Sequence, residues 1–113
     1  MHEIAIVENS FRVIMEVAQN ENLTKITRVN FLIGEMHGIV PGIFRHAFES
    51  AAEQTLAENA ELNLEVVPIQ MQCNSCEHIF IIKKTHYKCP ACGSAELKII
   101  SGKELTIKSI EGE

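Results

Sequence analysis

The sequence predicts an α+β fold, a small three-stranded sheet with two helices, interrupted by an inserted cysteine-bearing lobe. Two stretches carry apolar residues at helical spacing, three stretches alternate as strands do, and all four cysteines fall within residues 71–95. The chain has 113 residues, of which 46% are apolar. A chain of this length buries enough surface to form a hydrophobic core.

The first 35 residues predict a helix followed by a strand. Apolar residues in 3–19 recur at steps of three and four, which places them in one stripe along a helix. Residues 25–35 alternate between apolar and polar and predict a strand that ends near Gly34. The helical stripe comprises Ile4, Val7, Phe11, Ile14, Met15 and Ala18, and the apolar strand face comprises Val29, Phe31 and Ile33.

The next stretch predicts a second helix and two further strands. Pro41 suits the first turn of a helix, and the apolar stripe that follows predicts a helix ending around Glu58–Asn59. Residues 62–66 alternate as a second strand, and residues 97–110 have the composition of a third, in which Gly102 indicates a bulge or tight bend. Two helices on one face of a small sheet would bury both stripes.

The position of the cysteines sets the expected domain boundaries. Residues 1–70 and 96–113 are expected to form the α+β domain, because strand-like composition resumes after the cysteines. Residues 71–95 are expected to form an insert with its own short strand at 79–82.

The cysteine pattern indicates a metal site. Two C-x2-C pairs are separated by twelve residues, and Pro90 and Gly93 favour a tight turn at the second pair. Four thiolates from two such turns suit tetrahedral Zn(II) and describe a zinc ribbon, a closed and therefore structural site. The alternative is a pair of redox dithiols, which normally lie at a helix start after a strand. The predicted zinc ligands are Cys73, Cys76, Cys89 and Cys92.

Charge argues against a nucleic-acid-binding role for the insert. The whole chain has a net charge of −5, and a zinc tetrathiolate cancels the small positive balance of the insert. His78 and His86 flank the cysteine turns as possible zinc-flanking groups, either as surface residues or as residues that exchange with cysteine ligands.

Several sequence features argue against membrane proteins, secreted proteins and enzymes. No apolar run approaches the ~20 residues that span a bilayer, and no signal peptide precedes the first helix, so we expect a cytoplasmic protein without membrane contact. No phosphate-binding loop is present, and no nucleophile or open metal position indicates an enzyme. We expect a monomer or a weak homodimer.

The first three residues gather nitrogen donors. The amine of Met1, the imidazole of His2 and the backbone amides of His2 and Glu3 could form a planar set, which Ni(II) and Cu(II) favour. Chemistry alone leaves an alternative open, in which His2 is an ordinary polar residue. Glu3 would then only complement the dipole of the first helix.

Three segments resemble the HypA/HybF family of hydrogenase nickel-incorporation proteins. They are MHEIAIVENSF, RVNFLIGEMHGIVPGIFRHAFE, and the four-cysteine insert before LTIKSIEGE. The resemblance covers nearly the whole chain. It implies a nickel metallochaperone for [NiFe]-hydrogenase maturation, with transferable Ni(II) at the terminus (Met1, His2, Glu3) and structural Zn(II) in the insert.

The resemblance also implies partners, namely the GTPase HypB and the hydrogenase large subunit. Three other functions stay open from the residues alone. They are a zinc-ribbon nucleic-acid module, a dithiol oxidoreductase, and a structural adaptor in which the Met-His-Glu start has no role.

Overall fold

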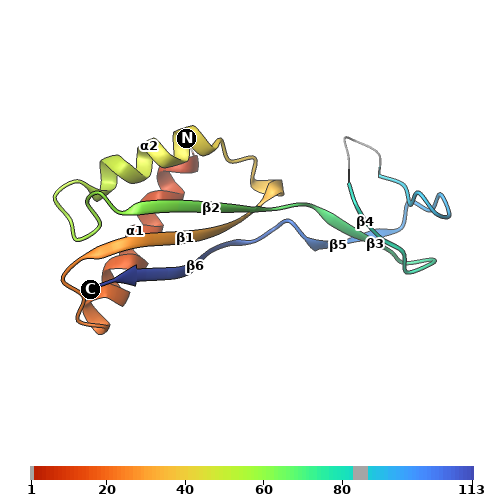
Figure 1. Cartoon of the computed structure of the whole chain (residues 1–113). Helices are drawn as coiled ribbons and strands as arrows, with labels where there is room; N and C mark the ends of the chain where they lie inside the picture. The colour runs from red at the N-terminus through yellow and green to blue at the C-terminus, as the bar shows by residue number, and fades with distance from the viewer. Residues whose placement is uncertain (1, 83–86) are drawn as a thin grey trace. The chain divides into compact units, whose positions relative to one another are not determined.

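The computed structural model describes residues 2–82 and 87–113 (Figure 1). The chain divides into two compact units. The first comprises Met1–Leu32, Ile39–Glu65 and Thr106–Glu113, and the second comprises Ile33–Gly38 and Val66–Leu105. The second unit therefore contains all of segment 71–95 together with flanking residues on both sides.

The described residues form two three-stranded sheets and two α-helices. The strand orders are β2-β1-β6 and β4-β3-β5. In chain order the elements are α1 (His2–Asn20), β1 (Ile26–Gly34), the 3-10 helix η1 (Glu35–His37), α2 (Pro41–Ala52), β2 (Glu61–Val67), β3 (Gln70–Cys73), β4 (Ile79–Ile81), β5 (Leu97–Ser101) and β6 (Leu105–Gly112).

Both helices pack against one face of the β2-β1-β6 sheet. Phe31 of β1 meets Phe44 of α2 edge-on, with ring centroids 5.1 Å apart. Phe48 of α2 contacts Phe11 of α1 with centroids 5.2 Å apart, which joins the two helices. Phe31, Phe44 and Phe48 are fully buried, and the predicted arrangement of two helices on a three-stranded sheet is confirmed.

The opposite face of this sheet is polar. Arg28 of β1 lies between Glu61 of β2 and Glu111 of β6, with closest nitrogen–oxygen distances of 2.8 and 3.2 Å. One row further along, Asn30 accepts a hydrogen bond from Asn63 and donates one to Ser109. The alternation predicted for residues 25–35 thus separates a buried apolar face from a hydrogen-bonded polar one.

The second helix is shorter than predicted. It ends at Ala52 and not around Glu58–Asn59. Gln54 has a φ of +62°, which a helix does not allow, and the hydroxyl of Thr55 donates to the carbonyl of Ala52 at 2.7 Å. Leu56, an apolar residue that a helix of the predicted length would include, is 38% exposed.

The segment predicted as a third strand, 97–110, is two strands that belong to different sheets. The chain bends at Gly102, as expected from the glycine, which has a φ of +105°. A Cβ at Gly102 would lie 2.8 Å from the Cα of Ile69. Only glycine fits this contact, so the pairing with β3 stops here and β6 begins at Leu105.

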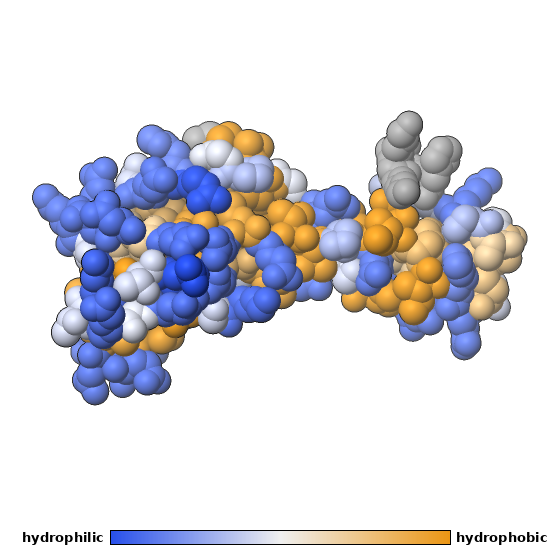
Figure 2. Space-filling model, in the orientation of Figure 1, coloured by the Kyte–Doolittle hydropathy of each residue, from blue (hydrophilic) through white to orange (hydrophobic). Residues whose placement is uncertain are grey.

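The sheet of the second unit is built around β3. Met71 of β3 pairs with Phe80 of β4 and with Ile99 of β5, and both pairings are antiparallel. The strand predicted at 79–82 is present as β4, which ends at Ile81, whereas β3 was not predicted. Ile79 and Ile81 are about half exposed, and Figure 2 shows hydrophobic residues on the surface of this unit.

Candidate metal centres

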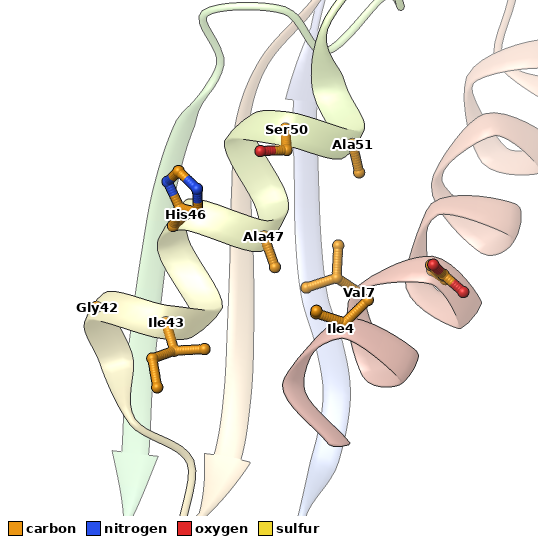
Figure 3. Close-up of a pocket in the computed structure, with 9 residues that line it drawn as sticks. Ile4, Val7, Gly42, Ile43, His46, Ala47, Ser50 and Ala51 are labelled. Atoms are coloured by element: carbon orange, nitrogen blue, oxygen red, sulfur yellow. The ribbon is translucent and has the colours of Figure 1, made fainter. Parts of the chain in front are cut away.

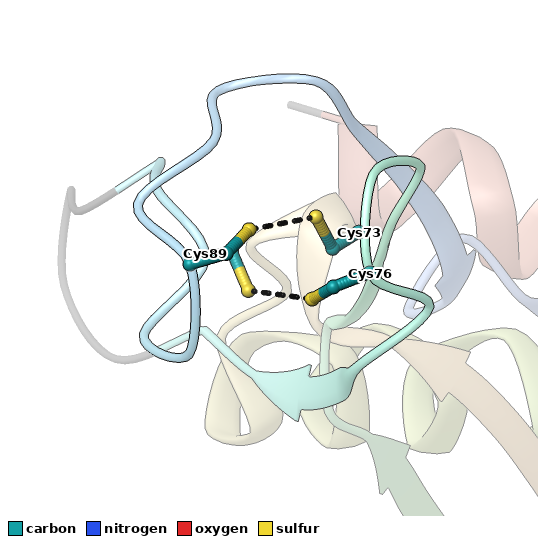
Figure 4. A group of neighbouring side chains, drawn as sticks. Cys73, Cys76 and Cys89 are labelled. Carbon is teal, nitrogen blue, oxygen red and sulfur yellow. Dashed lines mark hydrogen bonds between the residues drawn. The ribbon is translucent and has the colours of Figure 1, made fainter.

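The four predicted cysteines meet at one point in the second unit. Their sulfur atoms all lie within 4.8 Å of one another, and the four thiols are free. The sulfur atoms of Cys73 and Cys92 are 3.5 Å apart, and those of Cys76 and Cys89 are 3.6 Å apart (Figure 4). These distances are far beyond a disulfide bond of ~2.05 Å. They are near the edge of about 3.8 Å in a tetrahedron with metal–sulfur bonds of about 2.3 Å.

Each pair of cysteines is held by the same backbone hydrogen bonds. In the first turn, the amide of Glu77 donates to the carbonyl of Cys73, and the amide of Cys73 donates to the carbonyl of His78, both at 2.9 Å. The second turn repeats this pattern sixteen residues later, with Gly93 donating to Cys89 and Cys89 donating to Ser94. Two equivalent turns thus present two thiols each.

The residue after each pair has a left-handed conformation. Glu77 has a φ of +65° and Gly93 has a φ of +76°. The sequence signalled the second of these through its glycine, but a glutamate gives no such signal. The second C-x2-C turn was therefore the easier one to predict.

The thiols influence one another because of their proximity. Hydrogen bonds from the amides of Cys76 and Ser75 lower the pKa of the Cys73 thiol to about 6, against the desolvation caused by burial. The amide of Ser94 favours a thiolate at Cys92, but the neighbouring sulfur of Cys73 and desolvation outweigh it and raise the pKa of Cys92 to about 12. A divalent cation would relieve this competition and allow all four thiolates, so the donor set fits zinc.

Of the two histidines that flank the cysteine turns, the structure describes only His78. The exposed His78 stacks its ring on Phe80, with centroids 5.9 Å apart and planes 15° apart. His86 lies outside the described residues. A role for either histidine beside the metal stays a prediction.

At the start of the chain, the neighbouring side chains of His2 and Glu3 differ in exposure. The His2 side chain is 59% exposed, whereas that of Glu3 is 7% exposed. The amide of Val40, just before α2, donates to Oε2 of Glu3 at 3.2 Å, and Nδ1 of His2 is 3.7 Å from Oε1. Glu3 therefore joins the start of α1 to the start of α2, a contact that no sequence pattern indicated.

The environment of Glu3 favours its charged form. Its own amide, the amide of Val40 and, to a smaller extent, His2 hold the pKa of the Glu3 carboxyl below its ordinary value, against desolvation. Since α1 begins at His2, the amides of His2 and Glu3 lie in its first turn, where no carbonyl four residues earlier in the helix can accept from them. Nitrogen donors thus gather at this terminus, while Met1 lies outside the described residues.

Comparison with known proteins decides the family. The family model described as hydrogenase/urease nickel incorporation, metallochaperone, HypA matches residues 1–112. This chain belongs to the HypA family. The resemblance expected from the sequence is therefore confirmed.

Relatives within the HypA family match over the full chain. The hydrogenase maturation factor HypA of Picosynechococcus sp. is 40% identical over 111 residues, which cover 98% of each chain. The factor of the same name from Aquifex aeolicus is 34% identical and covers 100% of this chain and 98% of its own.

Solved HypA structures have the same fold. The solution structure of a HypA protein aligns with a TM-score of 0.74 at 30% identity, covering 100% of this chain and 97% of that one. The solution structure of the Ni metallochaperone HypA from Helicobacter pylori gives 0.67 at 28% identity, covering 97% and 96%. HypA is a family of nickel-incorporation metallochaperones and not of enzymes.

Within the described residues, no helix is long and apolar enough to cross a membrane.

Proposed function

We propose that this chain binds Ni(II) at its N-terminus and delivers it during [NiFe]-hydrogenase maturation, acting as a carrier and not as an enzyme. The observation that supports this most is the placement of the first residues. His2 opens α1 with its imidazole exposed, while the buried Glu3 fixes the helix start against the segment before α2.

The ligand chemistry of this proposal comes from Met1, His2 and Glu3. The amine of Met1, the imidazole of His2 and the deprotonated amides of His2 and Glu3 supply four nitrogen atoms, a set that suits square-planar Ni(II). Because the amine and the imidazole must both be deprotonated, binding weakens in acid. An exposed site with pH-dependent affinity is suited to releasing its ion.

The second metal in this proposal is Zn(II), held by Cys73, Cys76, Cys89 and Cys92. Four cysteine ligands leave no open coordination position, so the zinc would be structural. Nickel would belong to the α+β domain of residues 1–70 and 96–113, and zinc to the insert 71–95. The two metals would then have separate roles, one transferred and one retained.

The proposed setting is the cytoplasm. Nickel would pass in a complex with the GTPase HypB and the hydrogenase large subunit, partners that the family resemblance implies. The family description also includes urease, so a nickel enzyme of that kind is a second possible recipient.

Nickel titration of three proteins tests the proposal. They are the chain with its native first residue, the variant His2→Ala, and a chain with two extra residues ahead of Met1. We expect at least a tenfold loss of Ni(II) affinity in the last two, because each removes nitrogen donors. The variant His46→Ala, which removes an exposed histidine of the same unit, is the matched control and should bind as the native chain does.

Equal Ni(II) affinity in all these proteins would overturn the terminal site. Binding of DNA or RNA that weakens with salt would instead favour the alternative of a nucleic-acid-binding zinc ribbon. Zinc content, measured on the same samples, should stay constant throughout.

A further inference from the structure

An apolar groove lies between the first two turns of α1 and one side of α2 (Figure 3). Its volume is about 720 Å³. Ile4 and Val7 of α1 lie opposite Ala47 and Ala51 of α2, and Ile43 of α2 also lines the groove. Ile4 is 41% exposed and Ile43 is 39% exposed. Two isoleucines therefore stand at the surface around a hollow that they do not fill.

The groove is open because the side of α2 that lines it carries small residues. Phe11 and Phe48 fill another part of the space between the helices, with ring centroids 5.2 Å apart. Gly42, Ala47 and Ala51 line the groove and leave room for side chains from outside. From Gly42 to Ala51 the helix rises about 14 Å, the length of about two and a half helical turns.

The rim of the groove lies in an acidic unit. Glu8 of α1 lines the groove, and its carboxylate forms no ion pair among the described residues. Arg12 and Arg45 offset part of the negative charge, but the first unit has eleven glutamates against five lysines and arginines. The charge of this unit therefore favours a ligand with positive charge.

We propose that this groove binds an amphipathic helix of another protein, one with apolar residues at i, i+3 or i+4, and i+7 and with lysine or arginine along the edge of that face. The inference deepens the proposed function and rests on it. Ile4 lies only two residues after His2, so the bound helix would lie beside the proposed nickel terminus. A second copy of this chain is a poorer occupant, because a net charge of −5 opposes self-association.

A labelled peptide tests this occupant. The probe is a fluorescein-labelled amphipathic helix of about 16 residues with leucines at those spacings and lysines beside them. Its binding to the zinc-loaded full chain is followed by fluorescence anisotropy. We expect Ile4→Ser and Ile43→Ser each to weaken binding at least about tenfold. The variant Val13→Ser, an exposed apolar position on α1 outside the groove, is the matched control.

Two further variants test separately how the shape of the groove and the charge of its rim contribute to peptide binding. Ala47→Leu fills the groove and keeps good helix propensity, so it should abolish binding while circular dichroism stays native. Glu8→Lys should weaken binding several-fold at low salt and less at high salt, because an exposed charge is screened.

Several outcomes would overturn the proposal. Equal binding of a scrambled peptide without an apolar face would do so, as would an equal loss in Val13→Ser. Dimerisation in sedimentation that Ile43→Ser abolishes would assign the groove to a second copy. Binding to vesicles of anionic phosphatidylglycerol that Ile43→Ser abolishes would assign it to a membrane.

Nickel titration of the same variants separates this proposal from the previous one. We expect Ile43→Ser to retain nickel and lose the peptide, and His2→Ala to lose nickel and retain the peptide. If His2→Ala retains both while Ile43→Ser loses the peptide, the nickel site fails and the groove stands. If Ile43→Ser retains the peptide, the groove fails whatever the nickel result.

Discussion

The two units of this chain are stabilised by different means. The first buries the rings of Phe31, Phe44 and Phe48 between its helices and its sheet. In the second unit, the fully or nearly fully buried apolar residues among those described are Ile33, Met71, Cys73 and Cys89. Two of these four are candidate metal ligands.

Because of this difference, we expect core packing to stabilise the first unit and a metal ion to stabilise the second. A unit with so few buried apolar side chains cannot offset the entropy of ordering its loops by burial alone. Its half-exposed Ile79 and Ile81 add little to a core. The first unit should fold without metal, whereas the second should depend on the ion that its four thiols fit.

The largest expected effect comes from Cys89→Ala, which removes one buried ligand. Structural zinc in small domains contributes ~10–16 kcal/mol of apparent binding free energy, so losing a ligand should unfold the second unit. The amide resonances of 66–105 should collapse to random-coil shifts while those of α1 and α2 stay dispersed, and zinc content should fall. Ser75→Ala, in the other turn but not a ligand, is the control. Native dispersion throughout Cys89→Ala would show that metal does not hold this unit.

The reverse experiment is Phe48→Ala in the first unit. Truncating a fully buried phenylalanine costs ~3–5 kcal/mol, a large part of the ~5–15 kcal/mol that stabilises a domain. The urea midpoint of the α1 and α2 signals should fall, while zinc content stays at the native value. Val13→Ala, which changes an exposed position on α1, should leave the midpoint nearly unchanged. A parallel loss of zinc in Phe48→Ala would mean that the two units do not fold independently.

The sequence predicted those features that depend on residues near one another in the chain. The alternation around Phe31 identified β1, and helical spacing identified α1, because one face of each must be buried. The four cysteines were found for a related reason. Each C-x2-C turn brings two sulfur atoms together locally, and the use of two such turns in tetrahedral zinc sites predicted that the turns would meet.

Features set by distant contacts were missed. Glu3 bonds to the amide of Val40, 37 residues away. A bend at Gly102 was expected, but the division of 97–110 between two sheets was not, and it depends on the contact of Gly102 with Ile69. The early end of α2 depends on the left-handed conformation of Gln54, a residue type that seldom signals one. The nickel terminus stays a prediction, because its nitrogen donors suggested a metal site but only the resemblance favoured that site over an ordinary polar His2.

A smaller effect should distinguish the two cysteine turns, which have the same hydrogen bonds but different residues at the left-handed position. Gly93→Ala adds a Cβ that meets no atom within 4 Å, so its cost is purely conformational, ~1 kcal/mol or about fivefold in zinc affinity. Glu77→Gly removes the same strain from the first turn and should strengthen zinc binding by a similar factor, less the entropy of the added glycine. Competition with a chromophoric chelator measures the zinc affinity of both variants. If Gly93→Ala and Glu77→Gly changed the affinity equally and in the same direction, the two cysteine turns would not be equivalent.

The smallest effect should come from Glu3→Gln, which keeps the shape of the side chain that joins α1 to the segment before α2. Since the pKa of Glu3 is lowered in the folded chain, the charged carboxylate stabilises the fold above its ordinary pKa of 4.5. This stabilisation is lost as the pH falls through the folded-state pKa, where both states become protonated. The melting temperature of the first unit should therefore drop by a few degrees at neutral pH in Glu3→Gln, and the gap should shrink in acid, as the pH falls below 4.5. Glu8→Gln, an exposed change one turn further along α1, should show no gap at either pH. A gap for Glu3→Gln that persists in acid would show that the side chain acts through packing and not through its charge.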